Sequence, residues 1–143
     1  MENERNKILI VDDEKMNILT LAHCLKEQYD IIVATDGETG LEAALKHKPD
    51  LVLLDIIMPE MNGFDVIEKL KESEATRHIP VIFISGLNNQ ENDEKGMSLG
   101  AADFITKPFS KVIVKARVDI QFKLMEQEKT IEELKKLLGD KGN

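Results

Sequence analysis

Five side chains of this sequence could together carry out chemistry on a phosphoryl group. They are Asp12, Asp13, Asp55, Ser85 and Lys107, and each comes directly after a short apolar run or within two residues of its end. If those runs are parallel strands of one sheet, three carboxylates, a hydroxyl and an ammonium group converge beyond the carboxyl ends of the strands, where open α/β sheets form their sites.

Three carboxylates in one place repel each other unless a cation joins them. Oxygen ligands without histidine or cysteine suit Mg²⁺, which binds few carboxylates and keeps several waters. A metal beside a carboxylate nucleophile is what phosphoryl transfer requires, with Asp55 attacking in line. Lys107 can then neutralise the phosphoryl oxygens, and Ser85 can donate a hydrogen bond to one of them.

The elements that position these groups are predicted from hydrophobic patterns. Segments with helical spacing separate the apolar runs; Leu41, Ala44 and Leu45, for example, share one predicted helix face. Asp36-Gly37 and Asn62-Gly63 are turn or helix-start signals, and Gly100 is a predicted helix end. Alternating strands and helices predict an α/β fold with right-handed crossovers and a parallel sheet. The predicted strands are residues 8–11, 31–34, 51–54, 81–84 and 104–105.

Composition narrows the class of protein and the class of partner. A chain of 143 residues, 42% of them hydrophobic, predicts one folded domain with an appended element. The formal net charge of −8 argues against direct binding to nucleic acid or to an anionic membrane. A single cysteine, Cys24, and the absence of a signal peptide or an apolar span favour a soluble cytoplasmic protein.

Four motifs occur in an order and spacing that resemble the receiver domain of two-component response regulators. The resemblance covers residues 5–122 and implies a doubly wound, flavodoxin-like sheet of five parallel strands in the order 2-1-3-4-5. The motifs are Ile8-Leu-Ile-Val-Asp-Asp-Glu14, Leu53-Leu-Asp-Ile-Ile-Met-Pro-Glu-Met-Asn-Gly-Phe64, Ile84-Ser-Gly86 and Gly100-Ala-Ala-Asp-Phe-Ile-Thr-Lys-Pro-Phe109.

The resemblance also implies roles for individual residues. Asp55 would accept a phosphoryl group from a phosphohistidine on a sensor histidine kinase or a phosphotransfer protein, which makes the chain a regulatory domain rather than an enzyme. Mg²⁺ would be bound by Asp12, Asp13, Asp55 and the backbone carbonyl of Ile57. Ser85 and Phe104 would form a switch pair, and the Lys107-Pro108 bond would be cis.

The last predicted helix begins near Ser110 and continues to about Leu138, roughly 40 Å at about 1.5 Å per residue. We therefore divide the chain into a receiver domain, residues 1–122, and a helical extension, residues 123–143. The extension is predicted to form a dimeric coiled coil or to link to an output domain; the alternative is an ordinary last helix with a frayed, charged end. Six of eight heptad core positions are apolar, namely Ile113, Ile120, Leu124, Ile131, Leu134 and Leu138, and the other two are Arg117 and Gln127.

Two other functions compete with the phosphoacceptor. A metal-dependent phosphatase with an aspartyl nucleophile would need Asp-x-Asp after the first strand, where this chain has Asp12-Asp13-Glu14. A scaffold that only dimerises would not need the five polar groups. The sequence identifies neither the kinase and its stimulus nor the output, and it fits a fragment of a longer regulator as well as a stand-alone receiver.

The resemblance also suggests how long the phosphoryl group survives. The residues two beyond the acceptor and two beyond the hydroxyl flank the path of the hydrolytic water, and here they are Ile57 and Leu87. Aliphatic side chains cannot orient a water, so slow hydrolysis is predicted. If both side chains point away from that path, this prediction fails.

Overall fold

A five-stranded parallel sheet lies at the centre of the computed structural model, which describes residues 5–86 and 90–139. The strand order is β2-β1-β3-β4-β5, as predicted. β1, β3 and β4 are almost continuously buried because helices cover both faces of the sheet, whereas β2 lies at one edge and is only partly covered. The strands are β1 (Lys7–Val11), β2 (Asp30–Ala34), β3 (Leu51–Asp55), β4 (Val81–Ser85) and β5 (Asp103–Thr106).

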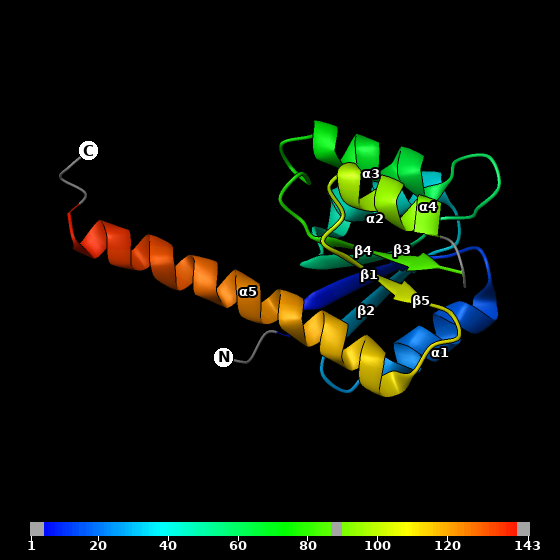
Figure 1. Ribbon diagram of the computed structural model, residues 1–143, viewed down its shortest axis with the longest axis horizontal. Coiled ribbons are helices and arrows are strands. Elements are labelled where there is room, and N and C mark those ends of the chain that lie inside the picture. Colours follow the sequence, from blue (N-terminus) through cyan, green and yellow to red (C-terminus); the bar gives the residue numbers. More distant parts are fainter. Residues whose placement is uncertain (1–4, 87–89, 140–143) are drawn as a thin grey trace.

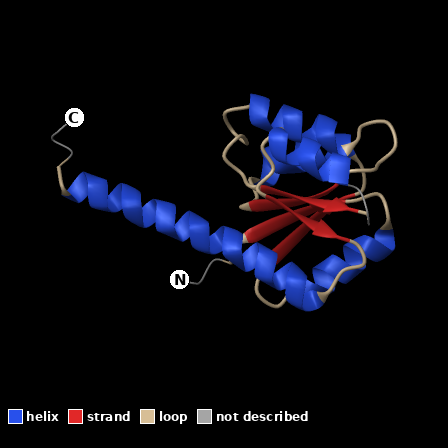
Figure 2. Cartoon of the chain, in the orientation of Figure 1, coloured by secondary structure: helices blue, strands red, loops and turns tan. Residues whose placement is uncertain are grey.

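The helices form a layer on each side of this sheet (Figures 1 and 2). α2, α3 and α4 cover one face over a core that contains Phe83 and Ile67, and α1 and α5 cover the other over a core that contains Ile10 and Val118. The helices are α1 (Lys15–Leu25), α2 (Gly37–His47), α3 (Gly63–Glu72), α4 (Gln90–Ser98) and α5 (Lys111–Leu137).

Side-chain caps fix where three of these helices begin. The Asp36 carboxylate accepts a hydrogen bond from the backbone N–H of Thr39, and Asn62 forms a reciprocal capping box with Asp65. The Ser110 hydroxyl accepts from the backbone N–H of Ile113 at the start of α5. The three sequence signals for helix starts are therefore confirmed.

α5 belongs to the domain for only part of its length. Val114, Val118 and Gln121 are buried against the sheet and α1. Where the helix leaves the domain, Phe122 stacks on Tyr29 at 5.1 Å between ring centroids, and the Tyr29 hydroxyl donates to Asp119 at 2.9 Å. Beyond this contact the helix extends away from the sheet (Figure 1), and its described residues are exposed or, at one position, half-buried.

Two details differ from the sequence-based expectation. Leu45 is half-exposed, although its spacing placed it on the buried face of α2. The strands are each longer than their apolar runs by one or two residues, which are polar or charged, because strand pairing continues past the apolar core. Among the described residues, no helix is long and apolar enough to cross a bilayer.

Candidate functional site at the carboxyl edge of the sheet

The carboxyl ends of four neighbouring strands bring the predicted residues together. β3 ends at Asp55 and β4 at Ser85, while Asp12 and Asp13 follow β1 directly and Lys107 follows β5. Carboxylate oxygens of Asp12, Asp13 and Asp55, hereafter the acidic trio, lie within 4.8 Å of one another. The Lys107 Nζ is 3.5 Å from Asp55 Oδ1, so a cation faces the central carboxylate.

Backbone contacts hold this arrangement in place. The backbone N–H of Glu14 donates to Asp12 Oδ1 at 2.9 Å, and the backbone N–H of Lys107 donates to the Ser85 carbonyl at 2.8 Å. The second bond ties the end of β5 to the end of β4. The Lys107-Pro108 bond is cis, as predicted.

Gly63 allows α3 to begin directly against the end of β3. Its backbone N–H donates to the Ile56 carbonyl at 2.8 Å. A Cβ at this position would lie 2.5 Å from the Asp55 carbonyl oxygen, closer than real Cβ contacts allow. The Asn62-Gly63 signal therefore has a second cause besides the helix start, namely the close approach of two backbone segments beside the acidic trio.

Burial makes two members of the acidic trio, Asp12 and Asp55, hard to ionise on their own. Asp12 is 0% exposed and Asp55 is 2% exposed. Desolvation by burial, reinforced by the Asp12 and Asp13 carboxylates, raises the pKa of Asp55 to about 7 although Lys107 and the backbone of Ile57 oppose the shift. Burial likewise raises the pKa of Asp12. These carboxylates therefore favour holding a proton or a cation near neutral pH.

Two buried oxygen atoms at this edge have no hydrogen-bond partner within the part of the chain that the structure describes. They are Asp12 Oδ2 and Ser85 Oγ. A buried polar atom without a partner is costly, so such an atom is expected to bind a water, an ion or another ligand. An all-oxygen donor set with one such carboxylate oxygen fits a hard divalent cation such as Mg²⁺. Ser85 Oγ is a free donor for a bound anion.

The predicted switch residues occupy different places. Ser85 is buried at the strand end, whereas Phe104 is half-buried on β5, opposite Phe83, and packs against the α2–α4 side of the sheet. Ser85 pairs in register with Thr106, two residues beyond Phe104. Phe104 is therefore one strand and two positions away from Ser85.

Of the two residues predicted to flank the water path, the Ile57 side chain is exposed in the loop after β3. Leu87 lies outside the described residues.

Sequence reasoning missed Asn17, in the first turn of α1. Its side chain contributes to lowering the pKa of Asp12, against the larger effect of burial, and donates to Glu14 at 2.7 Å. With Thr20, Pro108 and Phe109 it lines a hollow beside Lys107. The one available signal was its position four and five residues after the Asp12-Asp13 pair, about one helical turn away.

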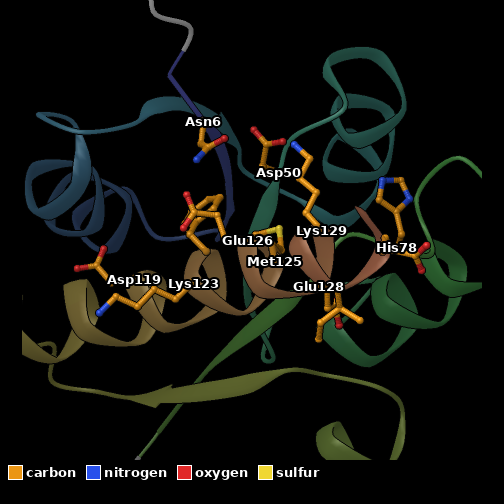
Figure 3. A pocket seen from close by; sticks show the side chains of 12 residues that line it. Asn6, Asp50, His78, Asp119, Lys123, Met125, Glu126, Glu128 and Lys129 are labelled. Atoms are coloured by element: carbon orange, nitrogen blue, oxygen red, sulfur yellow. The ribbon is translucent and has the colours of Figure 1, made fainter. Parts of the chain in front are cut away.

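A wider groove of about 930 Å³ lies at the opposite edge, where α5 leaves the domain. Figure 3 shows Asn6, Asp50 and His78 from the amino-terminal ends of the strands facing α5, which contributes Lys123 and Lys129. The groove is lined by none of Asp12, Asp13, Asp55 and Lys107. Choosing a hollow by its size alone would therefore place the chemical site at the wrong edge of the sheet.

Comparison with known proteins agrees with this geometry. The chain is 46% identical over 111 residues to a probable cyclic di-GMP phosphodiesterase of Vibrio cholerae, covering 78% of this chain and 25% of that protein. It is 44% identical over 113 residues to the response regulator PleD of Caulobacter vibrioides, with the same two coverages. The crystal structure of NtrX from Brucella abortus matches with a TM-score of 0.85 at 28% identity, over 92% of this chain and 30% of that one.

The chain spans about a quarter of the length of the first two relatives and about a third of the third. Residues 8–119 match the family described as the response regulator receiver domain, across most of the region that carries the fold and the acidic trio. The chain belongs to the response regulator receiver domain family.

Proposed function

We propose that Asp55 accepts a phosphoryl group from a sensor histidine kinase or a phosphotransfer protein, with Mg²⁺ bound by the acidic trio. The observation that carries this proposal is a buried carboxylate, Asp55, with two further carboxylates within 4.8 Å and an ammonium group at 3.5 Å. Burial alone already makes the charge of an aspartate unfavourable. A purely structural aspartate at a strand end would therefore not be expected beside two further carboxylates.

The transfer can be written with the groups present. An Oδ of ionised Asp55 attacks the phosphorus, and an acyl phosphate O–P bond forms as the bond from phosphorus to the donor's imidazole nitrogen breaks. The electron pair of that bond stays on the nitrogen. Lys107 approaches the phosphoryl oxygens as a cation, and the Ser85 hydroxyl donates to one of them.

The cation would be held by Asp12, Asp13, Asp55 and the backbone carbonyl of Ile57. When bound, Mg²⁺ would supply positive charge that keeps Asp55 ionised and offsets the phosphoryl oxygens. The unpartnered, buried Asp12 Oδ2 supports this role. The Ile57 carbonyl is included because of its place in the family motif.

We further propose that phosphorylation is relayed through Ser85 and Phe104 to α5. Ser85 Oγ has no partner among the described residues and is free to turn toward a phosphoryl group. Phe104 lies on β5, which leads through Lys107 into α5. In this proposal the domain is residues 1–122, and the extension, residues 123–143, forms a homodimer.

The chain would act as a cytoplasmic regulatory domain, without nucleic acid or membrane as direct partners, in keeping with the net charge of −8. The names of the relatives include a phosphodiesterase and a response regulator. Because this chain spans a quarter of those proteins, the activities in their names are not assigned to it. The phosphatase alternative loses support because Asp55 lies on β3, not β1.

The test is phosphorylation by a small donor, acetyl phosphate, followed by intact-mass spectrometry. Wild type should gain the mass of one phosphoryl group with Mg²⁺ and none after chelation, and Asp55→Asn should gain none. Asp30→Asn, which changes an exposed aspartate at the amino-terminal end of β2, is the matched control and should behave as wild type. Labelling that survives Asp55→Asn would reject the assignment.

A further inference from the structure

The outer face of α5 carries an apolar stripe that no described residue covers. The stripe consists of Ile113, Ile120, Leu124, Ile131, Leu134 and Leu138, whose side chains are 46% to 76% exposed. Val114, Val118 and Gln121, which face the domain, are buried. The stripe is therefore exposed along the helix and open to a partner helix, although Ile113 and Ile131 also border hollows beside the domain.

We propose that a second copy of this chain covers the stripe in parallel orientation and in register, and that two ion pairs between Lys123 of one copy and Glu128 of the other select that orientation. This inference rests on the dimer in the proposed function and assigns its geometry and the residues that determine it.

The positions of the two charges support the parallel arrangement. Lys123 immediately precedes the core position Leu124, and Glu128 immediately follows the core position Gln127. In a parallel two-stranded coiled coil, a residue at the first kind of position contacts the residue five further along the partner helix. Lys123 of one copy thus meets Glu128 of the other, and the two-fold symmetry makes two such pairs.

Both charges are available for this contact. Lys123 and Glu128 are exposed, and neither forms an ion pair with another described residue. Glu128 also has no basic residue three or four positions away on its own helix, because those positions hold Leu124, Met125, Ile131 and Glu132. Glu128 is therefore available to pair with a basic residue of another helix.

An antiparallel pairing would not bring Lys123 and Glu128 together. In that arrangement, a residue that precedes a core position, such as Lys123, faces a residue of the partner that also precedes one. A residue that follows a core position, such as Glu128, faces one that also follows. Lys123 therefore cannot lie opposite Glu128 in any antiparallel alignment. Glu128 would instead face Gln121, Lys135 or a second Glu128, depending on the alignment, and Lys123 would face Thr130 or a second Lys123. Only the parallel arrangement brings the two opposite charges together.

Gln127 fixes the alignment along the axis. In the in-register parallel dimer, the two Gln127 side chains share one core layer and can hydrogen-bond to each other. A shift by one heptad would place each amide against Ile120 or Leu134, which offer no partner, and an unpaired buried amide is costly. Arg117, the other polar core position, already pairs with Asp103 at 3.5 Å.

The experiment measures the dimer dissociation constant by sedimentation equilibrium for six proteins: the wild-type chain, two single variants, their double variant and two control variants. Lys123→Glu and Glu128→Lys should each weaken the dimer on the order of tenfold, because each turns two attractive contacts into repulsive ones. The double variant should recover to within about threefold of wild type. Lys129→Glu and Glu126→Lys make the same charge changes away from the interface and should leave the constant unchanged.

A cross-link tests the register independently. In a Cys24→Ala background, Gln127→Cys should give a disulfide-linked dimer on mild oxidation, and Lys129→Cys, which lies outside the core positions and lines the groove beside the domain, should not. A monomeric wild type at high micromolar concentration overturns both this inference and the proposed dimer. A wild-type dimer that the charge reversals do not affect, or that fails to cross-link through Gln127→Cys, overturns the parallel register and leaves the dimer standing.

Discussion

The carboxyl edge of the sheet and the outer half of α5 depart in opposite ways from the usual distribution of side chains. At the sheet edge, Asp12, Asp55 and Ser85 are buried, although carboxylates and hydroxyls are normally solvated. Along α5, leucine and isoleucine side chains are about half exposed or more, although residues of these types are normally buried. Charged groups are thus buried at the carboxyl edge of the sheet, and apolar side chains are exposed along α5.

Each departure is unfavourable in the isolated chain and is relieved by a different class of partner. Buried carboxylates cost free energy until a cation or a proton joins them. An exposed apolar stripe costs free energy until another apolar surface covers it. Both regions can therefore be located in the same way, by finding groups in an environment that only a partner or a ligand would make favourable.

The largest effect should come from Lys107, the cation that faces Asp55. Lys107→Ala should slow phosphorylation by acetyl phosphate on the order of a hundredfold, because one fixed charge aimed at the phosphoryl oxygens is lost. Lys46→Ala, on the exposed side of α2, is the control. The rate follows from the time course of intact mass. If Lys107→Ala reacts as fast as wild type, Lys107 does not contribute to the chemistry of this edge.

The second effect concerns the stripe and should leave the sheet edge unaffected. A truncation after Lys123 should be monomeric at high micromolar concentration by light scattering, because it removes four of the six apolar core positions. It should still accept a phosphoryl group, since the acidic trio lies at the other end. A truncation after Gly139 keeps the stripe and should still dimerise. Loss of phosphorylation in the shorter chain would mean that the two regions are not separable.

The third effect is a pH dependence of stability in the metal-free protein. Because burial raises the pKa of Asp55 to about 7, the folded state binds a proton more tightly than the unfolded state. The free energy of unfolding should therefore fall as the pH rises from about 4 to about 7, by at most about 1.4 kcal/mol per pH unit, and stay constant above that range. Urea unfolding at several pH values measures this dependence.

Asp55→Asn supplies the control for that measurement. The amide cannot titrate, so this contribution to the pH slope should disappear, and the variant should be more stable than wild type at pH 8 without metal. An equal slope in both proteins would show that another group controls the acid-side stability and that the burial of charge at the sheet edge costs little.

The smallest effect concerns loss of the phosphoryl group. Ile57 is exposed beside Asp55 and offers no hydrogen bond to an attacking water, so decay after removal of the donor should be slow. Ile57→Asn should speed this decay up to about tenfold by orienting a water. Ile57→Val, which stays aliphatic, is the control. Equal decay of all three proteins would mean that the side chain does not reach the path of the water.

Local signals in the sequence were sufficient for much of the fold and the site. Continuous apolar runs predicted the buried strands, and Asp36, Asn62 and Ser110 marked helix starts because their side chains satisfy backbone N–H groups within three residues. The acidic trio was predictable because parallel strands place their carboxyl ends at one edge. Its roles in metal binding and phosphorylation remain predictions.

What the sequence did not reveal depends on contacts between distant segments. α4 has few apolar residues, and only Gly96 is buried, where a Cβ would collide with the Phe83 ring, so no helical periodicity defines it. The bond between Tyr29 and Asp119 joins residues 90 positions apart. The exposure of Leu45 reflects how little of α2 the sheet covers. None of these features has a signature within one turn or one strand.

The Tyr29 contact with Asp119 and Phe122 gives α5 the mechanics of a lever with a fixed fulcrum. Residues 123–137, 15 in all, continue the helix beyond Phe122, an arm of about 22 Å at about 1.5 Å per residue. By simple geometry, a tilt of roughly 10° at the fulcrum would displace the tip by about 4 Å over that arm. That displacement approaches the pitch of one helical turn. A small movement near Lys107 could therefore change which residues the far end of α5 contacts.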